Sequence, residues 1–280
     1  MQAATGVPPR YRRSTLAKVP EITALFWLIK VLTTGMGEAT SDYLGQKSIV
    51  LAAGVGAVGL IIALWWQFRT SRYIAAVYWF AVAMVAVFGT MAADGWHKLF
   101  GVPYSVETAG YAVVLAVVFY FWRRSERTLS IHSIVTPRRE AFYWLTVVAT
   151  FALGTAAGDL TATTMHLGFS GSIVLFAALI AVPAIGWRLG LNPIAAFWIA
   201  YVLTRPLGAS IADWFGKPHS FAGGLDYGDG TVAAVATVLI AALVGYVSIA
   251  RTDIQREAPA AMPHGADRPA NELSRAEVSP

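Results

Sequence analysis

Four aspartates share one spacing from a tryptophan, and carboxylates in such a register can bind cations or relay protons. Each Asp lies fifteen residues after its Trp, which gives the pairs Trp27 and Asp42, Trp79 and Asp94, Trp144 and Asp159, and Trp198 and Asp213. Only 8 of the 280 residues are Asp, so chance does not account for four identical spacings. The pattern predicts a fourfold internal repeat.

Further charged residues fall on the same helical face as these aspartates. At 100° per residue, positions 3, 7, 11, 14 and 15 after each Trp lie on one arc of a helix. This face is predicted to line the interior and to bind cations through Glu38, Asp42, Asp94, Asp159 and Asp213. Lys30 and Arg205 are predicted to be their internal counter-ions, because a charge inside a membrane needs a partner or a polar cavity.

Other parts of the repeat have structural explanations. A Trp near a membrane interface is often an aromatic-belt anchor. Ten residues after each Trp stands a glycine that forms a Gly-xxx-small pair with the residue four positions later, and such pairs predict close packing between helices. These glycines are Gly37, Gly89, Gly154 and Gly208. The aspartates themselves have two alternative interpretations, exposure to the outer headgroups or a structural ion-pair network that joins the repeats.

Histidines near two of the aspartates are candidate metal ligands. His97 follows Asp94 by three residues and His166 follows Asp159 by seven, and carboxylate plus imidazole suits divalent transition metals. The sequence has no cysteine, P-loop, nucleophile elbow or zinc-protease helix. We therefore expect a protein that is not an enzyme and needs no cofactor.

The elements that position these residues are predicted to be transmembrane helices. Charged residues make up only 13% of the chain, against about a quarter in soluble domains. Uncharged runs of 21 residues, such as the one between Lys47 and Arg69, are long enough to cross the bilayer. The sequence predicts an all-α polytopic membrane protein with eight helices, at about residues 21–43, 48–67, 73–96, 106–122, 140–161, 171–187, 193–215 and 230–250.

Basic residues fix the predicted orientation. Alternate loops hold nearly all the arginines, whereas the opposite loops hold only Lys47, Lys98 and Lys217, so the positive-inside rule places both termini in the cytoplasm. The same rule explains the net charge of +5 without a nucleic-acid partner. Every hairpin begins on the same side, so the repeats are parallel. The predicted units are a basic leader (1–20), two four-helix halves (21–122 and 140–250), a cytoplasmic linker (123–139) and a disordered tail (251–280).

The first repeat resembles a bacterial family of integral-membrane proteins of unknown function. The resemblance rests on the segment Lys18 to Thr23, on Phe26 to Lys30, and on the run from Gly37 to Leu44. The family is built from four tandem two-helix repeats, each with a characteristic Trp, and is often described only as membrane-anchored. The resemblance extends over about residues 17–250 and implies a multi-pass protein of the bacterial inner membrane. The fourth repeat departs from the first, because Arg205 replaces Thr34 and Ala209 replaces Glu38.

These observations leave three functional hypotheses. The leading one is a transporter of a small cation, including a divalent metal, through the repeated carboxylates. The second is a sensor or a subunit of a membrane complex, in which the polar face only holds the hairpins together. The third is a transporter of a small anion or organic solute that uses Lys30 and Arg205. The bilayer is the one certain partner, and the sequence leaves the oligomeric state open.

Overall fold

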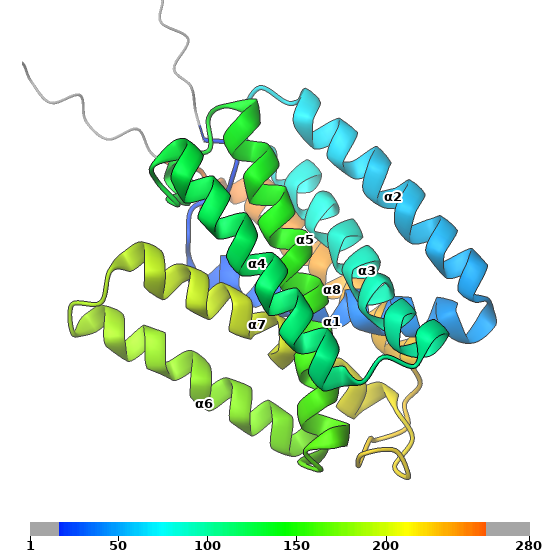
Figure 1. Ribbon diagram of the computed structural model, residues 1–280. Coiled ribbons are helices and arrows are strands. Elements are labelled where there is room, and N and C mark those ends of the chain that lie inside the picture. Colours follow the sequence, from blue (N-terminus) through cyan, green and yellow to red (C-terminus); the bar gives the residue numbers. More distant parts are fainter. Residues whose placement is uncertain (1–16, 256–280) are drawn as a thin grey trace, which may run out of the picture.

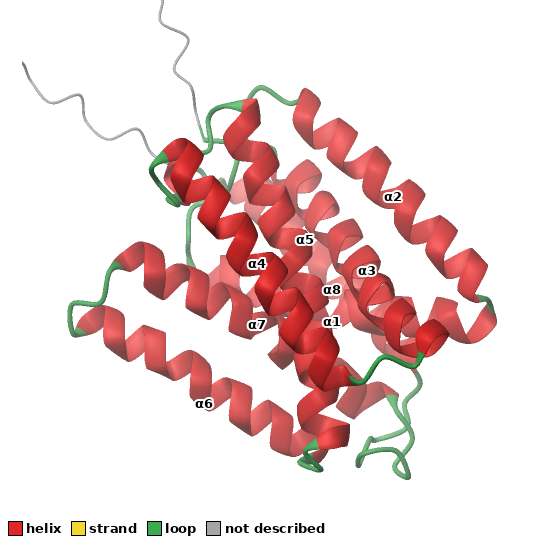
Figure 2. Ribbon diagram, viewed as in Figure 1, coloured by secondary structure: helices red, strands yellow, loops and turns green. Residues whose placement is uncertain are grey.

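The structure, a computed structural model, describes residues 17–255, which form eight α-helices and no strand (Figures 1 and 2). The helices are α1 (Ala24–Lys47), α2 (Ile49–Arg69), α3 (Ala75–Phe100), α4 (Tyr104–Glu126), α5 (Pro137–Asp159), α6 (Gly168–Arg188), α7 (Pro193–Gly216) and α8 (Asp229–Ala250). A π-helical turn (Leu160–Thr164) extends α5. Residues 1–16 of the predicted leader and 256–280 of the predicted tail lie outside the described residues.

Side-chain caps and glycine explain several helix ends. Thr23 and Thr136 accept hydrogen bonds from backbone N–H groups in the first turns of α1 and α5. Ser48 separates α1 from α2, because its backbone N–H bonds Leu44 while its hydroxyl caps α2. Gly101 ends α3 in the left-handed conformation (φ 64°), later than predicted. The additional turn of α3 places His97 and Lys98 on the helix.

The four odd-numbered helices form a closed inner ring. Helix α1 packs against α3 and α7, and α5 packs against the same two helices from the opposite side. Each even-numbered helix packs on the inner helix of the following repeat, so that α2 covers α3, α4 covers α5, α6 covers α7, and α8 covers α1. Figure 1 shows α2 and α6 along the edges of the molecule. The predicted division into inner odd helices and outer even helices is therefore confirmed.

Seven of the eight helices are long and apolar enough to cross a membrane. The exception by composition is α1, which carries Lys30, Glu38 and Asp42. All three side chains are buried within the protein, so they do not meet lipid. The outer helices expose most of their apolar side chains, as expected of helices that face the hydrocarbon core. The chain is a multi-pass helical membrane protein.

The repeated glycines allow close contact around the whole ring. A Cβ atom added to each would collide with the residue seven positions after the Trp of the next inner helix. The four contacts pair Gly37 with Ala86, Gly89 with Phe151, Gly154 with Arg205, and Gly208 with Thr34. The last contact closes the ring from the fourth repeat back to the first. The close helix packing predicted from the glycine spacing is confirmed, because each of these glycines contacts a neighbouring inner helix.

Equivalent residues of the four repeats lie at the same level, which makes the inner helices parallel. We call the two ends of the ring the Asp end and the Trp end. Trp79, Trp144 and Trp198 are buried in the core, whereas Trp27 is half-buried. The interpretation of these residues as belt anchors at the lipid interface was therefore wrong for three of the four. Their rings pack on neighbouring aromatic side chains, which for Trp198 include Phe119 and Trp122 of the outer helix α4.

The two predicted halves do not form separate units. Helix α8 of the second half covers α1 of the first, and α4 of the first covers α5 of the second. The predicted linker is also shorter than 123–139, because α4 continues to Glu126 and Pro137 already begins α5. Both ends of the described chain meet at the Trp end, where the Glu21 N–H donates to the Asp253 carbonyl at 2.8 Å. Residues 251–255 of the predicted tail are thus part of the folded structure.

Candidate functional site

An arginine–glutamate pair occupies the centre of the inner ring. Arg205 of α7 is fully buried, and its Nη2 lies 2.7 Å from a carboxylate oxygen of Glu38 on α1. The same nitrogen donates to the hydroxyls of Thr90 on α3 and Thr155 on α5, the latter at 2.7 Å. Glu38, Thr90 and Thr155 all stand eleven residues after their Trp. One guanidinium from the fourth repeat thus binds equivalent positions of the other three.

Gly154 makes the position of Arg205 possible. A Cβ at Gly154 would overlap the Cβ and Cγ atoms of Arg205, so the glycine provides the space for the arginine stem. The fourth repeat has Ala209 at the position of Glu38, and this small side chain leaves the centre to the guanidinium. A buried pair of this kind is stable only when hydrogen bonds satisfy the charges on both sides. The two threonine hydroxyls also donate to Glu38, each at 3.2 Å.

A layer of carboxylates lies above this pair at the Asp end, bridged by two lysines. Lys98 lies 3.3 Å from Asp42 and 2.7 Å from Asp94. Lys217 contacts Asp42, and it lies 3.9 Å from Asp213 and 3.1 Å from Asp229. Burial opposes the charge on Lys217, but attraction to its three carboxylates outweighs burial and raises its pKa. The lysine is therefore charged at neutral pH.

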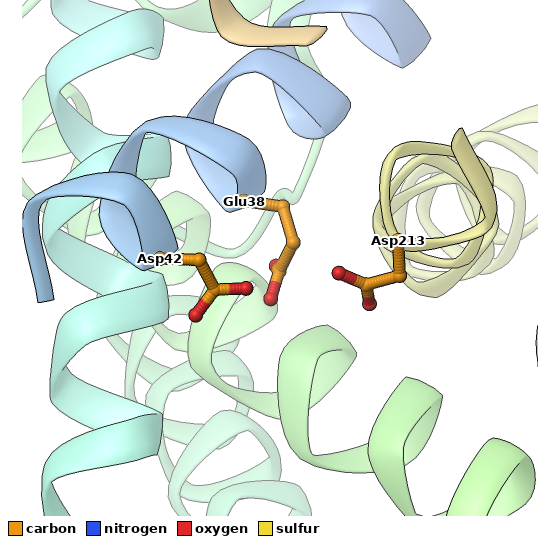
Figure 3. A group of neighbouring side chains, drawn as sticks. All are labelled: Glu38, Asp42 and Asp213. Carbon is orange, nitrogen blue, oxygen red and sulfur yellow. The ribbon is translucent and has the colours of Figure 1, made fainter. Parts of the chain in front are cut away.

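Three carboxylates converge where the central pair meets the lysine-bridged layer. Glu38, Asp42 and Asp213 each place an oxygen within 4.8 Å of the others (Figure 3). Asp42 and Asp213 are mostly buried, and all three side chains point toward one another from α1 and α7. Carboxylate oxygens at this spacing are hard ligands that suit small cations. Of the five predicted ligands, these three form one group.

Asp159 differs from the other repeat aspartates. It is half-buried, as Asp94 is, but among residues 17–255 it makes no ion pair. A lysine stands four residues after Asp94 and after Asp213, whereas Thr163 stands four residues after Asp159. The π-helical turn also begins directly after Asp159.

Neither predicted metal-binding histidine joins the carboxylate group. The Nδ1 atom of His97 lies 2.8 Å from the Val102 carbonyl, and its ring stacks on Tyr104. These contacts fix His97 at the end of α3. His166 is exposed in the turn after α5, with φ of 57°. The turn ends the helix before His166, so helical spacing from Asp159 no longer applies.

Lys30 lacks the ionic partner that the sequence suggested. Its side chain is fully buried, and its Nζ has no hydrogen-bond acceptor among the described residues. The ammonium lies over two aromatic rings, at 4.1 Å from the centre of Tyr201 and 4.5 Å from that of Phe151. Eight residues, more than two helical turns, separate Lys30 from Glu38, and Arg205 occupies that carboxylate. The prediction of Lys30 as a counter-ion is wrong for this conformation.

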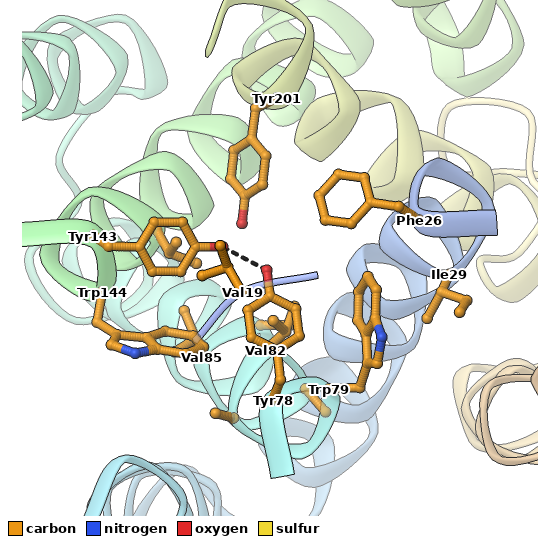
Figure 4. Close-up of a cluster of buried hydrophobic side chains, with 14 of the residues drawn as sticks. Val19, Phe26, Ile29, Tyr78, Trp79, Val82, Val85, Tyr143, Trp144 and Tyr201 are labelled. Atoms are coloured by element: carbon orange, nitrogen blue, oxygen red, sulfur yellow. Dashed lines mark hydrogen bonds between the residues drawn. The ribbon is translucent and has the colours of Figure 1, made fainter. Parts of the chain in front are cut away.

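Aromatic side chains close the ring at the Trp end. The hydroxyls of Tyr78 and Tyr143 lie 2.5 Å apart, and Tyr201 and Phe26 point toward the same centre (Figure 4). Trp79 packs on Phe26 and on Tyr78. The ring therefore has a charged Asp end and an aromatic Trp end.

The repeat found in the sequence matches a known family. The family model described as Repeat of Unknown Function (DUF347) matches four segments of the chain, at residues 25–73, 77–128, 142–189 and 196–253. The chain belongs to this family. The four DUF347 segments coincide with the four helical hairpins, each with one inner and one outer helix. No curated protein and no solved structure matches the chain.

Sequence reasoning missed several residues of the DUF347 site. Lys98 and Lys217 were assigned only to loops, although each stands four residues after a repeat aspartate, on the same helical face. Thr90 and Thr155 were also missed, although they share the register of Glu38. Comparing all four repeats at each position, rather than charged residues alone, reveals both pairs.

Proposed function

We propose that this protein is a transporter of a small cation, a proton or a divalent metal, in the bacterial inner membrane. The observation that carries the proposal is the convergence of Glu38, Asp42 and Asp213 inside the ring of parallel helices. Around this group the Asp end holds more acidic than basic side chains. Asp94, Asp159 and Asp229 add to the three carboxylates, and Lys47, Lys98, Lys217 and Arg205 oppose them. Such an excess attracts cations.

In the proposed mechanism, a cation competes with Arg205 for Glu38. The guanidinium is held by that carboxylate and by threonine hydroxyls, all of which are also ligands for a hard cation. A bound cation or proton weakens the attraction between Glu38 and Arg205, so Arg205 moves and the contact between α1 and α7 loosens. The aromatic residues around Tyr78 and Tyr143 close the opposite end meanwhile. Opening of that end while the Asp end closes would complete alternating access.

The proposed orientation places the Asp end outside the cell and both termini in the cytoplasm. The helix ends and loops at the Trp end carry Arg69, Arg72, Arg123, Arg124, Arg127, Arg138, Arg139, Arg188 and Arg251. The Asp end has lysines only, and two of these are paired with the carboxylates. Basic loops remain preferentially in the cytoplasm. Cations would therefore enter the carboxylate group from outside, or leave through it.

Flux into proteoliposomes tests the proposal. Wild-type protein is expected to carry H⁺ or one of Mn²⁺, Ni²⁺ and Zn²⁺ in a saturable manner, and Asp213→Asn is expected to reduce that flux at least about tenfold, since a site carboxylate loses its charge. Asp226→Asn is the matched control, because Asp226 is exposed in the loop at the same end and makes no ion pair among the described residues. Absence of flux in the wild type, or full flux in Asp213→Asn, overturns the proposal.

A non-transporting membrane component is the second candidate, and the lysine bridges favour it. Lys98 links α3 to α1, and Lys217 links α7 to α1 and α8, so the charged layer also holds the ring together. If this is its only role, Asp42→Asn lowers the unfolding temperature in detergent, and neither the wild type nor the variant shows cation flux. Transport predicts loss of flux in Asp213→Asn protein that remains folded.

A further inference from the structure

A polar pocket of about 520 Å³ lies at the Trp end, between the start of α3 and the end of α8. Arg72 and Arg251 stand at its rim, together with Tyr73 and Asp253. Its apolar lining includes the exposed Ile74 and the buried Val247 of α8, and the exposed Ile249 follows on α8 two residues after Val247. The pocket is far from the carboxylate group, so it does not belong to the proposed cation site.

The repeat symmetry relates this pocket to a second position, where side chains of the protein bind one another. There, Glu140 at the start of α5 lies 2.6 Å from Lys18 and 3.0 Å from the amide nitrogen of Gln67 at the end of α2. Glu140 stands four residues before Trp144, and Gln67 stands six residues before the end of the first matched repeat. An acidic group buried between two repeats is thus neutralised by a cation from the N-terminal segment.

At the pocket, the positions equivalent to Glu140 and Gln67 are both apolar. Ala75 stands four residues before Trp79, and Val247 stands six residues before the end of the fourth matched repeat, so they replace Glu140 and Gln67. The pocket thus has two arginines but no acid at the position equivalent to Glu140. Across residues 17–255, neither Arg72 nor Arg251 has a side-chain hydrogen bond or an ion pair.

The one carboxylate in the pocket is already engaged. The Tyr73 hydroxyl donates to Asp253 at 2.5 Å, and the Asp253 backbone carbonyl accepts from Glu21. Burial, with the bonded carboxylate of Asp253, raises the pKa of Tyr73 above its ordinary value, so the hydroxyl remains a donor at neutral pH. The contact anchors the chain end after α8 and leaves the arginines to an external anion.

We propose that this pocket binds the phosphate of an anionic membrane lipid through Arg72 and Arg251. The arginines lie at the ends of membrane-spanning helices, where headgroups are found, and α8 and Ile74 offer an apolar surface for the acyl chains. Guanidinium groups bind phosphate oxygens in a bidentate manner, and basic pockets between helices are typical lipid-headgroup sites. A bound lipid would bridge the end of α8, the outer helix that covers α1, and the start of α3. This inference does not depend on cation transport.

Native mass spectrometry of the purified protein in detergent tests the proposal. The full chain is mixed with equal amounts of phosphatidylglycerol and phosphatidylcholine that carry the same acyl chains. The wild type is expected to retain phosphatidylglycerol about tenfold more than phosphatidylcholine, because two arginines face one phosphate with a net negative lipid charge. The double variant Arg72→Gln, Arg251→Gln is expected to retain both lipids equally.

Two further variants separate a specific site from a general charge effect. Arg124→Gln with Arg188→Gln removes the same charge from exposed arginines of the Trp-end loops, and it is expected to keep the wild-type preference. Ala75→Glu places an acid in the register of Glu140, where it would occupy the arginines and abolish the preference. Equal loss in the control variant, or full preference in the Arg72, Arg251 variant, overturns the proposal. Displacement of the lipid by millimolar inorganic phosphate also overturns it, in favour of a soluble anion.

Discussion

Lys30 and Arg205 are both buried among the inner helices and both contact the aromatic side chain of Phe151, but their other surroundings differ. Arg205 has Glu38 and two threonine hydroxyls as partners, whereas Lys30 has only aromatic faces. A cation–π contact compensates part of the desolvation of an ammonium, and a carboxylate with hydrogen bonds compensates far more. Arg205 is therefore an integral part of the closed structure, while Lys30 is a charge that this conformation leaves uncompensated.

Removal of Arg205 is expected to have the largest effect. Arg205→Met leaves the Glu38 carboxylate buried without its counter-ion, which costs about 3–5 kcal/mol of unfolding free energy. Reversible unfolding in detergent measures the change. Arg205→Met combined with Glu38→Gln should recover part of the loss, because no isolated charge remains. Equal stability of Arg205→Met and the wild type would mean that the pair is not formed in the membrane protein.

Gly154→Ala tests the space that Arg205 requires. The new methyl group would overlap the Arg205 stem, so we expect a loss of about 1–3 kcal/mol from overpacking. Gly110→Ala is the matched control, because nothing lies within 4 Å of the added Cβ there, and it should leave stability unchanged or raise it by up to about 1 kcal/mol. The same unfolding assay applies, and equal effects of the two changes would argue against the close contact.

Lys30→Met is expected to act in the opposite direction from Arg205→Met. The methionine has a similar length and removes the unpartnered ammonium, so unfolding free energy should rise by about 1–3 kcal/mol. Thermal unfolding in detergent at neutral pH measures the change. A loss of unfolding free energy as large as that of Arg205→Met would contradict the contrast between the two cations. It would mean that Lys30 has a partner that the described structure does not show.

The lysines of the Asp end are expected to give the smallest effects. Lys98→Gln should cost at most about 1 kcal/mol, because the Lys98 side chain is 49% exposed and water screens its ion pairs. Lys217→Gln should cost more than Lys98→Gln, since Lys217 is less exposed and contacts three carboxylates. Unfolding at low and high salt distinguishes the two, with the Lys98→Gln effect vanishing first.

The sequence predicts the inner and outer helices well because spacing and hydropathy are local properties. The Trp-to-Asp register and the repeated glycines identified the inner faces, and the uncharged runs identified the spans. Partners across the ring were harder to predict, since they depend on which helix follows which around the circle. Arg205 reaches Glu38 because α7 adjoins α1, a closure that no local pattern indicates. Likewise, Lys30 and Glu38 lie on the same face of one helix, but Arg205 of the fourth repeat binds that carboxylate instead.

The central claim, that a cation bound at Glu38, Asp42 and Asp213 displaces Arg205, can be tested by cysteine accessibility. The natural chain contains no cysteine, so Thr155→Cys introduces a single thiol beside the Arg205 guanidinium. The buried thiol is expected to react slowly with a charged maleimide and at least about tenfold faster with the transported cation present, as a closed site opens. Asp226→Cys should react quickly and Val87→Cys slowly in both conditions. Unchanged Thr155→Cys reactivity with H⁺, Mn²⁺, Ni²⁺ and Zn²⁺ would contradict the account.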